Sequence, residues 1–227
     1  MKRTIIIMAK VPIAGTVKTR LQPFLSPEKC AELATAFLGD TESKAKNACE
    51  NTILAYSPAA QRNILKKILR YENTLIEQKG KDLGEKMLNA FEFVFRQNPD
   101  SAVVMIGTDS PTLPAECIEE AFKALEDESK IVLGKTEDGG FYLIGLKQSL
   151  PGIFEGIKWS TSMVYTQLIK NIENLKIDNL KLIPTWYDVD NAGDLERLYG
   201  EVAQNKKIQE SAPRTYEWLA SNSEIFD

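Results

Sequence analysis

A cation-rich loop follows directly after a short β-branched run near the N-terminus, residues 4–7. A glycine in such a loop permits close backbone approach, so that backbone amides can bind phosphate oxygens. Lysine and arginine neutralise phosphate charge that the amides only partly balance. The spacing therefore predicts a nucleotide or sugar-nucleotide site, with a basic surface loop as the alternative. The candidate ligands are Lys10, Gly15, Lys18, Thr19 and Arg20.

Acidic residues follow two further segments that read as extended chain. Asp109 comes just after the strongly apolar residues 101–107, and its carboxylate suits a divalent cation that bridges a diphosphate. Asp188 and Asp190 alternate in an extended segment, so both can face one site. Structural roles are the alternative for these residues: Asp109 could form an Asx turn, and Asp190 or its neighbour Asn191 could cap a helix.

A third segment, residues 137–140, has the sequence Glu-Asp-Gly-Gly and lies between two expected strands. Two glycines after an acid permit a tight turn with positive φ and a close backbone approach. The segment therefore predicts either a β-hairpin turn or a cradle for a ligand. Metal-assisted chemistry on a nucleotide needs groups that bind phosphate and carboxylates that hold the metal. The cation-rich loop, Asp109, and the pair Asp188 and Asp190 would together supply these groups.

Composition narrows the chemistry further. The chain has no histidine, which excludes Ser-His-Asp, Cys-His and His-zinc chemistry and leaves carboxylates, lysine or tyrosine with hard cations such as Mg²⁺ or Mn²⁺. A net charge of −4, from 28 basic and 32 acidic residues, argues against a general nucleic-acid surface. The three cysteines are far apart in sequence and indicate neither a disulfide framework nor a zinc site.

Several other classes of protein are excluded by spacing and length. Thr16 and Val17 separate the glycine from the lysine, unlike a P-loop, and no G-x-G-x-x-G fingerprint occurs. No apolar run approaches the roughly 18 residues that span a bilayer, and the N-terminal run is too short for a signal peptide. We therefore expect a cytoplasmic protein without a membrane span.

The elements that must position these residues alternate between strand and helix. This alternation predicts one α/β domain over residues 1–227, a three-layer α/β/α sandwich with a mostly parallel sheet and ligands beyond the carboxyl ends of its strands. Expected strands cover residues 4–7, 52–56, 74–77, 101–107, 130–135, 141–146 and 180–184. Expected helices cover residues 26–48, 59–71, 83–96, 114–126, 161–174 and 191–204.

The motifs also occur in a familiar order: Lys-x-Pro-x-x-Gly-x-x-Lys-Thr-Arg-Leu, Gly-Thr-Asp-Ser-Pro-x-Leu-Pro, Glu-Asp-Gly-Gly-Phe-Tyr-Leu-Ile-Gly-Leu, Trp-Ser-Thr and Asp-x-Asp. Over residues 5–198 this order resembles a bacterial family of glycosyltransferase-like proteins with the GT-A, or nucleotide-diphospho-sugar transferase, fold. Some members of that family are assigned to arsenosugar biosynthesis. The same fold contains nucleotidyltransferases of the phospholactate guanylyltransferase and molybdenum cofactor types, which also begin with a basic, glycine-containing loop.

The resemblance implies roles for individual residues. The loop of the first motif would meet the nucleotide, and Asp109 would hold the metal together with Asp188 and Asp190. Asp138 would act as general base, so the implied catalytic residues are Asp138 and Asp109. The sugar or acceptor would be approached by Gly139, Gly140 and Trp159.

One departure from the glycosyltransferase pattern leaves the reaction open. Ser110 and Pro111 follow Asp109, where a glycosyltransferase of this fold usually has Asp-x-Asp, and this pattern is closer to the nucleotidyltransferases. We expect a Mg²⁺- or Mn²⁺-dependent glycosyl transfer from a nucleotide sugar to a small acceptor. Nucleotidyl transfer from a nucleoside triphosphate is the alternative, and a non-catalytic nucleotide-binding protein is the second alternative.

Overall fold

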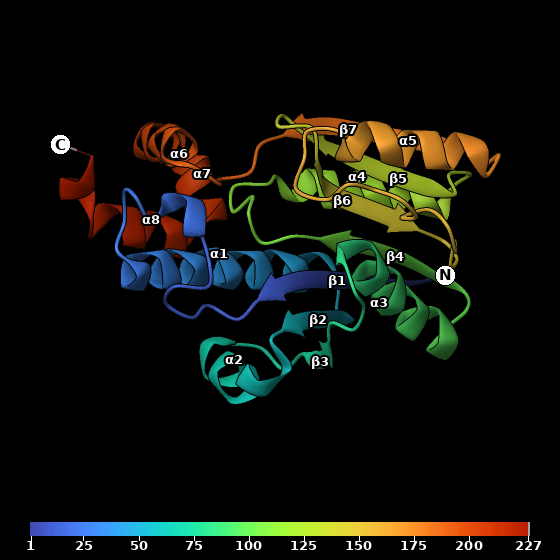
Figure 1. Ribbon diagram of the computed structural model, residues 1–227, viewed down its shortest axis with the longest axis horizontal. Coiled ribbons are helices and arrows are strands. Elements are labelled where there is room, and N and C mark those ends of the chain that lie inside the picture. Colours follow the sequence, from blue (N-terminus) through green and yellow to red (C-terminus); the bar gives the residue numbers. More distant parts are fainter. Residues whose placement is uncertain (227) are drawn as a thin grey trace.

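A computed structural model of the chain describes residues 1–226 (Figure 1). Its centre is a seven-stranded sheet with the order β3-β2-β1-β4-β6-β5-β7. Only β6 runs antiparallel to its neighbours among the described strands, so the sheet is mostly parallel, as predicted. The strands are β1 (Lys2–Lys10), β2 (Thr52–Ser57), β3 (Thr74–Glu77), β4 (Ser101–Ile106), β5 (Ile131–Thr136), β6 (Phe141–Leu146) and β7 (Leu180–Trp186).

Helices cover both faces of the sheet because strand side chains alternate between two cores. In β1, Ile5 and Ile7 pack in a core that includes α1 and α4, whereas Ile6 packs in a core that includes α3 and α5. The three-layer α/β/α architecture is thus confirmed. The helices are α1 (Pro27–Ala48), α2 (Arg62–Ile68), α3 (Leu83–Gln97), α4 (Ala115–Glu126), α5 (Val164–Asn174), α6 (Ala192–Gln204), α7 (Lys206–Ser211) and α8 (Pro213–Ala220), with short 3₁₀ helices η1 (Thr19–Leu21), η2 (Ala59–Gln61) and η3 (Ser223–Ile225).

A third core lies beyond the sheet, where the C-terminal helices α6–α8 gather beside α1 (Figure 1). Its buried side chains come from α1, α6 and α8, from residues 21 and 25 before α1, and from Tyr187 and Val189 after β7. The buried carboxylate of Asp40 in α1 accepts hydrogen bonds from the backbone amides of Arg214 (3.0 Å) and Thr215 (2.8 Å). Asp40 thereby satisfies the first turn of α8 and attaches it to α1.

Two helices differ in extent from the prediction. The helix expected over residues 59–71 starts only at Arg62, because residues 59–61 form the 3₁₀ helix η2. It ends at Ile68, since buried Glu42 accepts hydrogen bonds from the backbone amides of Arg70 and Tyr71 and holds that segment outside the helix. The helix expected from residue 161 starts at Val164, because residues 159–163 form turns and a bend, with Ser160 at φ 61°. The structure adds α7 and α8, for which no helix is predicted from the sequence.

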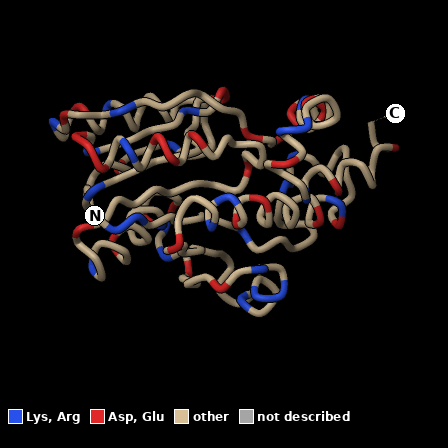
Figure 2. The backbone as a smooth tube through the Cα atoms, turned by 180° about the vertical axis from the view of Figure 1, so that it is seen from behind, with Lys and Arg blue, Asp and Glu red and all other residues tan. Residues whose placement is uncertain are grey.

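Basic and acidic positions are interspersed along the chain, as Figure 2 shows. Within residues 1–226, every helix is too short or too polar to cross a bilayer.

Candidate functional site

A cavity of about 690 Å³ opens at the end of the sheet where β1, β4 and β7 terminate. Such a position beyond the carboxyl ends of parallel strands is the usual ligand site of an open α/β sheet. The wall combines segments that are far apart in sequence: residues 8–10, 17–20, 105–109, 140–142, 159–162, 188 and 190, with single residues between them.

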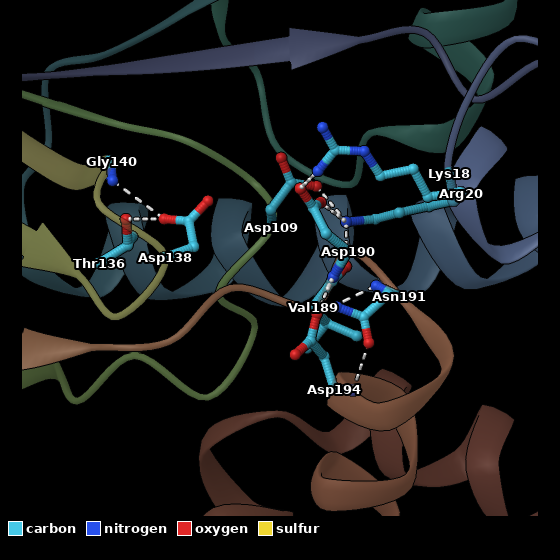
Figure 3. Close-up of polar contacts among 10 residues, drawn as sticks. All are labelled: Lys18, Arg20, Asp109, Thr136, Asp138, Gly140, Val189, Asp190, Asn191 and Asp194. Carbon is cyan, nitrogen blue, oxygen red and sulfur yellow. Dashed lines mark hydrogen bonds and ion pairs between the residues drawn. The ribbon is translucent and has the colours of Figure 1, made fainter. Parts of the chain in front are cut away.

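Lys18 lies at the centre of the charged part of this cavity (Figure 3). Its side chain is only 6% exposed, and its ammonium contacts the carboxylate of Asp109 and donates to the carbonyl of Val189 at 2.7 Å. The same Nζ lies 3.7 Å from Oδ1 of Asp190, and Arg20 Nη1 lies 3.2 Å from Oδ2 of Asp190. The loop after β1 is therefore joined by ion pairs to the ends of both β4 and β7.

The segments after β4 and β7 are also joined through their backbones. The amide of Val189 donates to the carbonyl of Asp109 at 2.9 Å, and Val189 is fully buried. Asp188 and Asp190, on either side of it, both line the cavity, as their alternation predicts. Asn191 is the residue that caps α6, through a bond from the amide of Asp194, so Asp190 is left to face the cavity.

The carboxylates at this end of the cavity influence one another. Burial raises the pKa of Asp188 to about 7, with further upward contributions from Asp138, Asp190 and Asp109. Burial also raises the pKa of Asp190, against the lowering effect of Lys18. A buried group of like charges favours a bound cation, because the cation offsets both burial and mutual repulsion.

The donor chemistry fits a hard divalent cation. Within residues 1–226, no three carboxylate or thiol side chains are grouped so that they could hold a metal ion by themselves. Asp109 and Asp190 do share one cation, the ammonium of Lys18, so their carboxylates can face a common charge. Mg²⁺ typically binds one or two protein carboxylates together with phosphate oxygens, and the observed aspartates would supply that part of the coordination.

Asp138 lies apart from the lysine, beside Thr136 and Gly140 (Figure 3). Both the hydroxyl of Thr136 and the amide of Gly140 donate to its Oδ1, which leaves Oδ2 without a partner among the described residues. The turn is the predicted β5–β6 hairpin. Gly139 has φ +94°, and a Cβ there would lie 2.1 Å from the carbonyl oxygen of Ser162, so this turn requires glycine.

Trp159 forms an aromatic part of the wall. Its ring lies 6.4 Å from Phe141 and 6.3 Å from Phe154, measured between centroids. Its indole Nε1 is enclosed and has no hydrogen-bond partner within residues 1–226. At the start of α3, a Cβ on Gly84 would lie 2.9 Å from the Trp159 ring, so Gly84 allows the helix to approach the indole closely.

The structure brings together most residues that the sequence predicts for the site. Lys10, Thr19 and Arg20 line the cavity and are exposed to solvent. Two predicted glycines, Gly15 and Gly139, do not line the cavity that the described residues form. Both have positive φ, +82° at Gly15, and shape loops beside it. The cavity is lined by the following residues from the predicted set: Lys10, Lys18, Thr19, Arg20, Asp109, Asp138, Gly140, Trp159, Asp188 and Asp190.

Two groups of residues at the site have no counterpart in the prediction. Gln78, directly after β3, and Leu83 and Met87 of α3 line the cavity, and only the position of Gln78 after a strand end hints at this. Arg197 of α6 pairs with Glu137 at 2.7 Å and stacks 3.9 Å from the centroid of Tyr187. This second group ties α6 to the turn that carries Asp138.

Comparisons with known proteins agree with this fold. The family described as uncharacterised proteins conserved in bacteria (DUF2064) matches residues 41–161. A Desulfovibrio desulfuricans G20 protein, provisionally assigned as a nucleotide-diphospho-sugar transferase, is 31% identical and superposes with a TM-score of 0.90 over 99% of this chain and 97% of its own.

Two more distant structures show the shared fold alone. A cytidylyltransferase from Leptospira borgpetersenii serovar Hardjo-bovis is 14% identical, with a TM-score of 0.59 over 99% of this chain and 96% of its own. A CMP:2-keto-3-deoxy-manno-octonic acid synthetase, solved with CTP, is 11% identical, with a TM-score of 0.57 over 90% and 99%. The first two of these three proteins carry transferase names and the third is named a synthetase. The nucleotide-diphospho-sugar transferase fold predicted from the motifs is confirmed.

Proposed function

Because the chain belongs to the DUF2064 family and has the fold of nucleotide-dependent transferases, we propose that it is a metal-dependent transferase acting on a nucleotide-activated substrate. Glycosyl transfer from a nucleotide sugar to a small acceptor is the reaction that we favour, in line with the name given to its 31% identical relative. The observation that carries the proposal is the contact of Lys18 with Asp109 and Asp190, which joins cations and carboxylates at one end of a cavity.

The cationic side chains would hold the diphosphate. Arg20 is 61% exposed and reaches the cavity from η1, so its guanidinium can turn from Asp190 to a phosphate oxygen. Lys18 would exchange its contacts with Asp109 and Asp190 for phosphate contacts when a divalent cation takes over charge compensation. When bound, Mg²⁺ or Mn²⁺ would neutralise the diphosphate and stabilise the leaving group.

Asp138 is the best available general base in a chain without histidine. One of its oxygens is held by Thr136 and Gly140, and the other is left for a proton from the acceptor. Trp159, on the same cavity wall, presents an aromatic surface on which an acceptor or sugar can pack.

Nucleotidyl transfer is the second candidate, because one specific feature favours it. Asp109 at the end of β4 is followed by Ser110 and Pro111, so this strand end lacks Asp-x-Asp. The same carboxylates and cations would then act on a nucleoside triphosphate. The two reactions differ in the bond that breaks, C1–O of a sugar donor or Pα–O of a triphosphate.

A thermal-shift panel tests the proposal. Nucleoside diphosphates, triphosphates and nucleotide sugars are each compared with and without Mn²⁺, and a ligand at 100 times its Kd should add about 2.7 kcal/mol of stability. Stabilisation by nucleotide sugars that depends on Mn²⁺ supports glycosyl transfer. A preference for triphosphates over every nucleotide sugar refutes that reaction in favour of nucleotidyl transfer. If a donor stabilises the protein but an activity assay finds no turnover of any donor, not even by hydrolysis, catalysis is refuted.

A further inference from the structure

Glu137 joins the turn that carries Asp138 to two neighbouring elements. Its backbone amide donates to the carbonyl of Trp186, the last residue of β7, at 3.1 Å. Its carboxylate accepts two hydrogen bonds from the guanidinium of Arg197 in α6, at 2.7 Å from Nη1 and 3.3 Å from Nη2. A forked pair of this kind fixes both the distance and the angle between the two side chains. Neither Glu137 nor Arg197 is among the described residues that line the cavity, so they would act on the site through other residues.

Arg197 is itself held by the segment that follows β7. Its Nε donates to Oε1 of Glu201 at 2.9 Å, and its guanidinium carbon lies 3.9 Å from the centroid of the Tyr187 ring. Tyr187 is only 4% exposed, and its hydroxyl donates to Oε2 of Glu201 at 2.6 Å. Tyr187 directly precedes Asp188, which lines the cavity. Arg197 therefore connects the turn that carries Asp138 with the segment that carries the cavity aspartates.

Helix α6 also fixes the backbone that precedes it. Oδ2 of Asp194 accepts hydrogen bonds from the backbone amides of Asp190, at 2.9 Å, and Asn191, at 3.0 Å (Figure 3). Asp194 and Arg197 are three positions apart, so their side chains lie on the same side of the helix. One turn of α6 thus holds Asp190, and the next turn holds the segment with Asp138.

We propose that Arg197 is a positioning residue that sets the distance between Asp138 and the aspartates at the metal end of the cavity. This inference rests on the proposed function, in which Asp138 takes the acceptor proton and Asp190 belongs to the metal site. A general base must lie within hydrogen-bond reach of the acceptor while the metal holds the donor. A misplacement of about 1 Å between such groups can cost on the order of 100-fold in rate.

The division between binding and turnover tests this role. Arg197→Ala should bind the donor and Mn²⁺ within about threefold of the wild type, because the phosphate-binding cations lie in the loop after β1, outside the contacts of Arg197. Its kcat should fall about 10- to 100-fold. Its melting temperature should change little, since the side chains of the pair are 43% and 54% exposed and α5 also holds the turn, through a 2.9 Å or shorter bond from Tyr165 to Gly139 (2.8 Å).

Further substitutions show whether Arg197 acts through Asp138. In an Asp138→Asn protein, Arg197→Ala should reduce turnover by less than about threefold, because the group that it positions is no longer a base. Arg197→Lys keeps one charged contact with Glu137 and should recover part of the lost kcat. Arg96→Ala removes a surface arginine that pairs with Glu92 at 3.9 Å in α3, so it is the matched control and should leave kcat unchanged.

Three results would overturn the inference. The first is a kcat of Arg197→Ala within about twofold of the wild type, and the second is a loss of donor affinity that equals the loss of kcat. The third is an equal reduction by Arg197→Ala in the wild type and in Asp138→Asn. If Arg197→Ala does not fold, Glu137→Gln decides, because it removes the charge of the pair at the same side-chain shape, and an unchanged kcat there overturns the inference.

The outcomes also separate this inference from the proposed function. If the wild type turns over no donor, the proposed function fails and the inference with it. If the wild type is active and Arg197→Ala is equally active, only the inference fails.

Discussion

Replacing Asp188 by asparagine should stabilise the metal-free protein above neutral pH while removing metal-dependent ligand binding. Burial, with the neighbouring Asp138 and Asp190 carboxylates, raises the pKa of Asp188 from 3.8 to about 7. A carboxylate in such surroundings is retained at a cost to stability, which is typical of a residue that serves a ligand. Asparagine has nearly the same shape and carries no charge, so it should relieve that cost.

The size and sign of the effect follow from proton linkage. Between pH 4 and pH 7 the folded state holds a proton on Asp188 that the unfolded state has released, so the free energy of unfolding falls as pH rises through this window. A rise in the pKa of Asp188 from 3.8 to about 7 corresponds to roughly 4 kcal/mol of unfolding free energy. Because Asp188 is partly accessible at the cavity, we expect solvent screening to reduce the gain at pH 8 to about 2 to 3 kcal/mol.

Urea unfolding in EDTA, followed by tryptophan fluorescence, measures the difference. Asp188→Asn should exceed the wild type by that amount at pH 8 and by much less at pH 4.5, where Asp188 is protonated in the folded protein. Asp178→Asn, at an exposed carboxylate outside the cavity, is the matched control and should change stability by less than about 0.5 kcal/mol at both pH values. A gain that is absent at pH 8, or equal at both pH values, refutes the reasoning.

Three further substitutions probe the charged end of the cavity and the loop that supports it. Asp109→Asn should abolish Mn²⁺-dependent nucleotide binding with little change in melting temperature, because its side chain is 52% exposed; a lower melting temperature with intact binding would assign it to the turn instead. Titration calorimetry should show that Arg20→Ala weakens nucleotide binding about 10- to 150-fold, whereas Arg62→Ala on α2 leaves it unchanged. Equal affinities of Arg20→Ala and the wild type would contradict a phosphate contact of Arg20. Lys44 is buried, donates to the carbonyl of Pro111 at 2.9 Å, and has its pKa lowered by burial to about 8. As pH rises, the folded state loses the Lys44 proton at a lower pH than the unfolded state does. The unfolding free energy of the wild type should therefore rise relative to that of Lys44→Met by about 2 to 3 kcal/mol between pH 7 and pH 10. A difference between the two proteins that stays constant over this range would contradict the lowered pKa.

Most secondary structure could be predicted from the sequence because the signals are local. Ser26 accepts a hydrogen bond from the amide of Lys29 and caps α1 before Pro27, as their order in the sequence predicts. The short strand β3 and the β5–β6 hairpin also occur where expected. Helix α2 is shorter than its pattern suggests, since its end depends on Glu42, which lies in another helix.

The candidate site could be predicted as a set of residues but only partly as a geometry. Motif order placed Asp109, Asp188 and Asp190 at strand ends, and the parallel sheet then brings those ends together. Gln78 carries no motif, and its fixed orientation arises from carbonyls in two other strands. A sequence pattern cannot indicate such a contact, because nothing within a few residues of Gln78 requires it.

The sequence by itself determined the type of fold, the cation-rich loop and the acidic strand ends, because periodicity, turn chemistry and capping act over a few residues. Tertiary structure alone decided which charges meet. Lys18 contacts Asp109 and Val189, which are 91 and 171 positions away in the chain. Such contacts depend on strand order and on the burial of three separate cores, and only the folded sheet brings these strand ends within reach of one ammonium group.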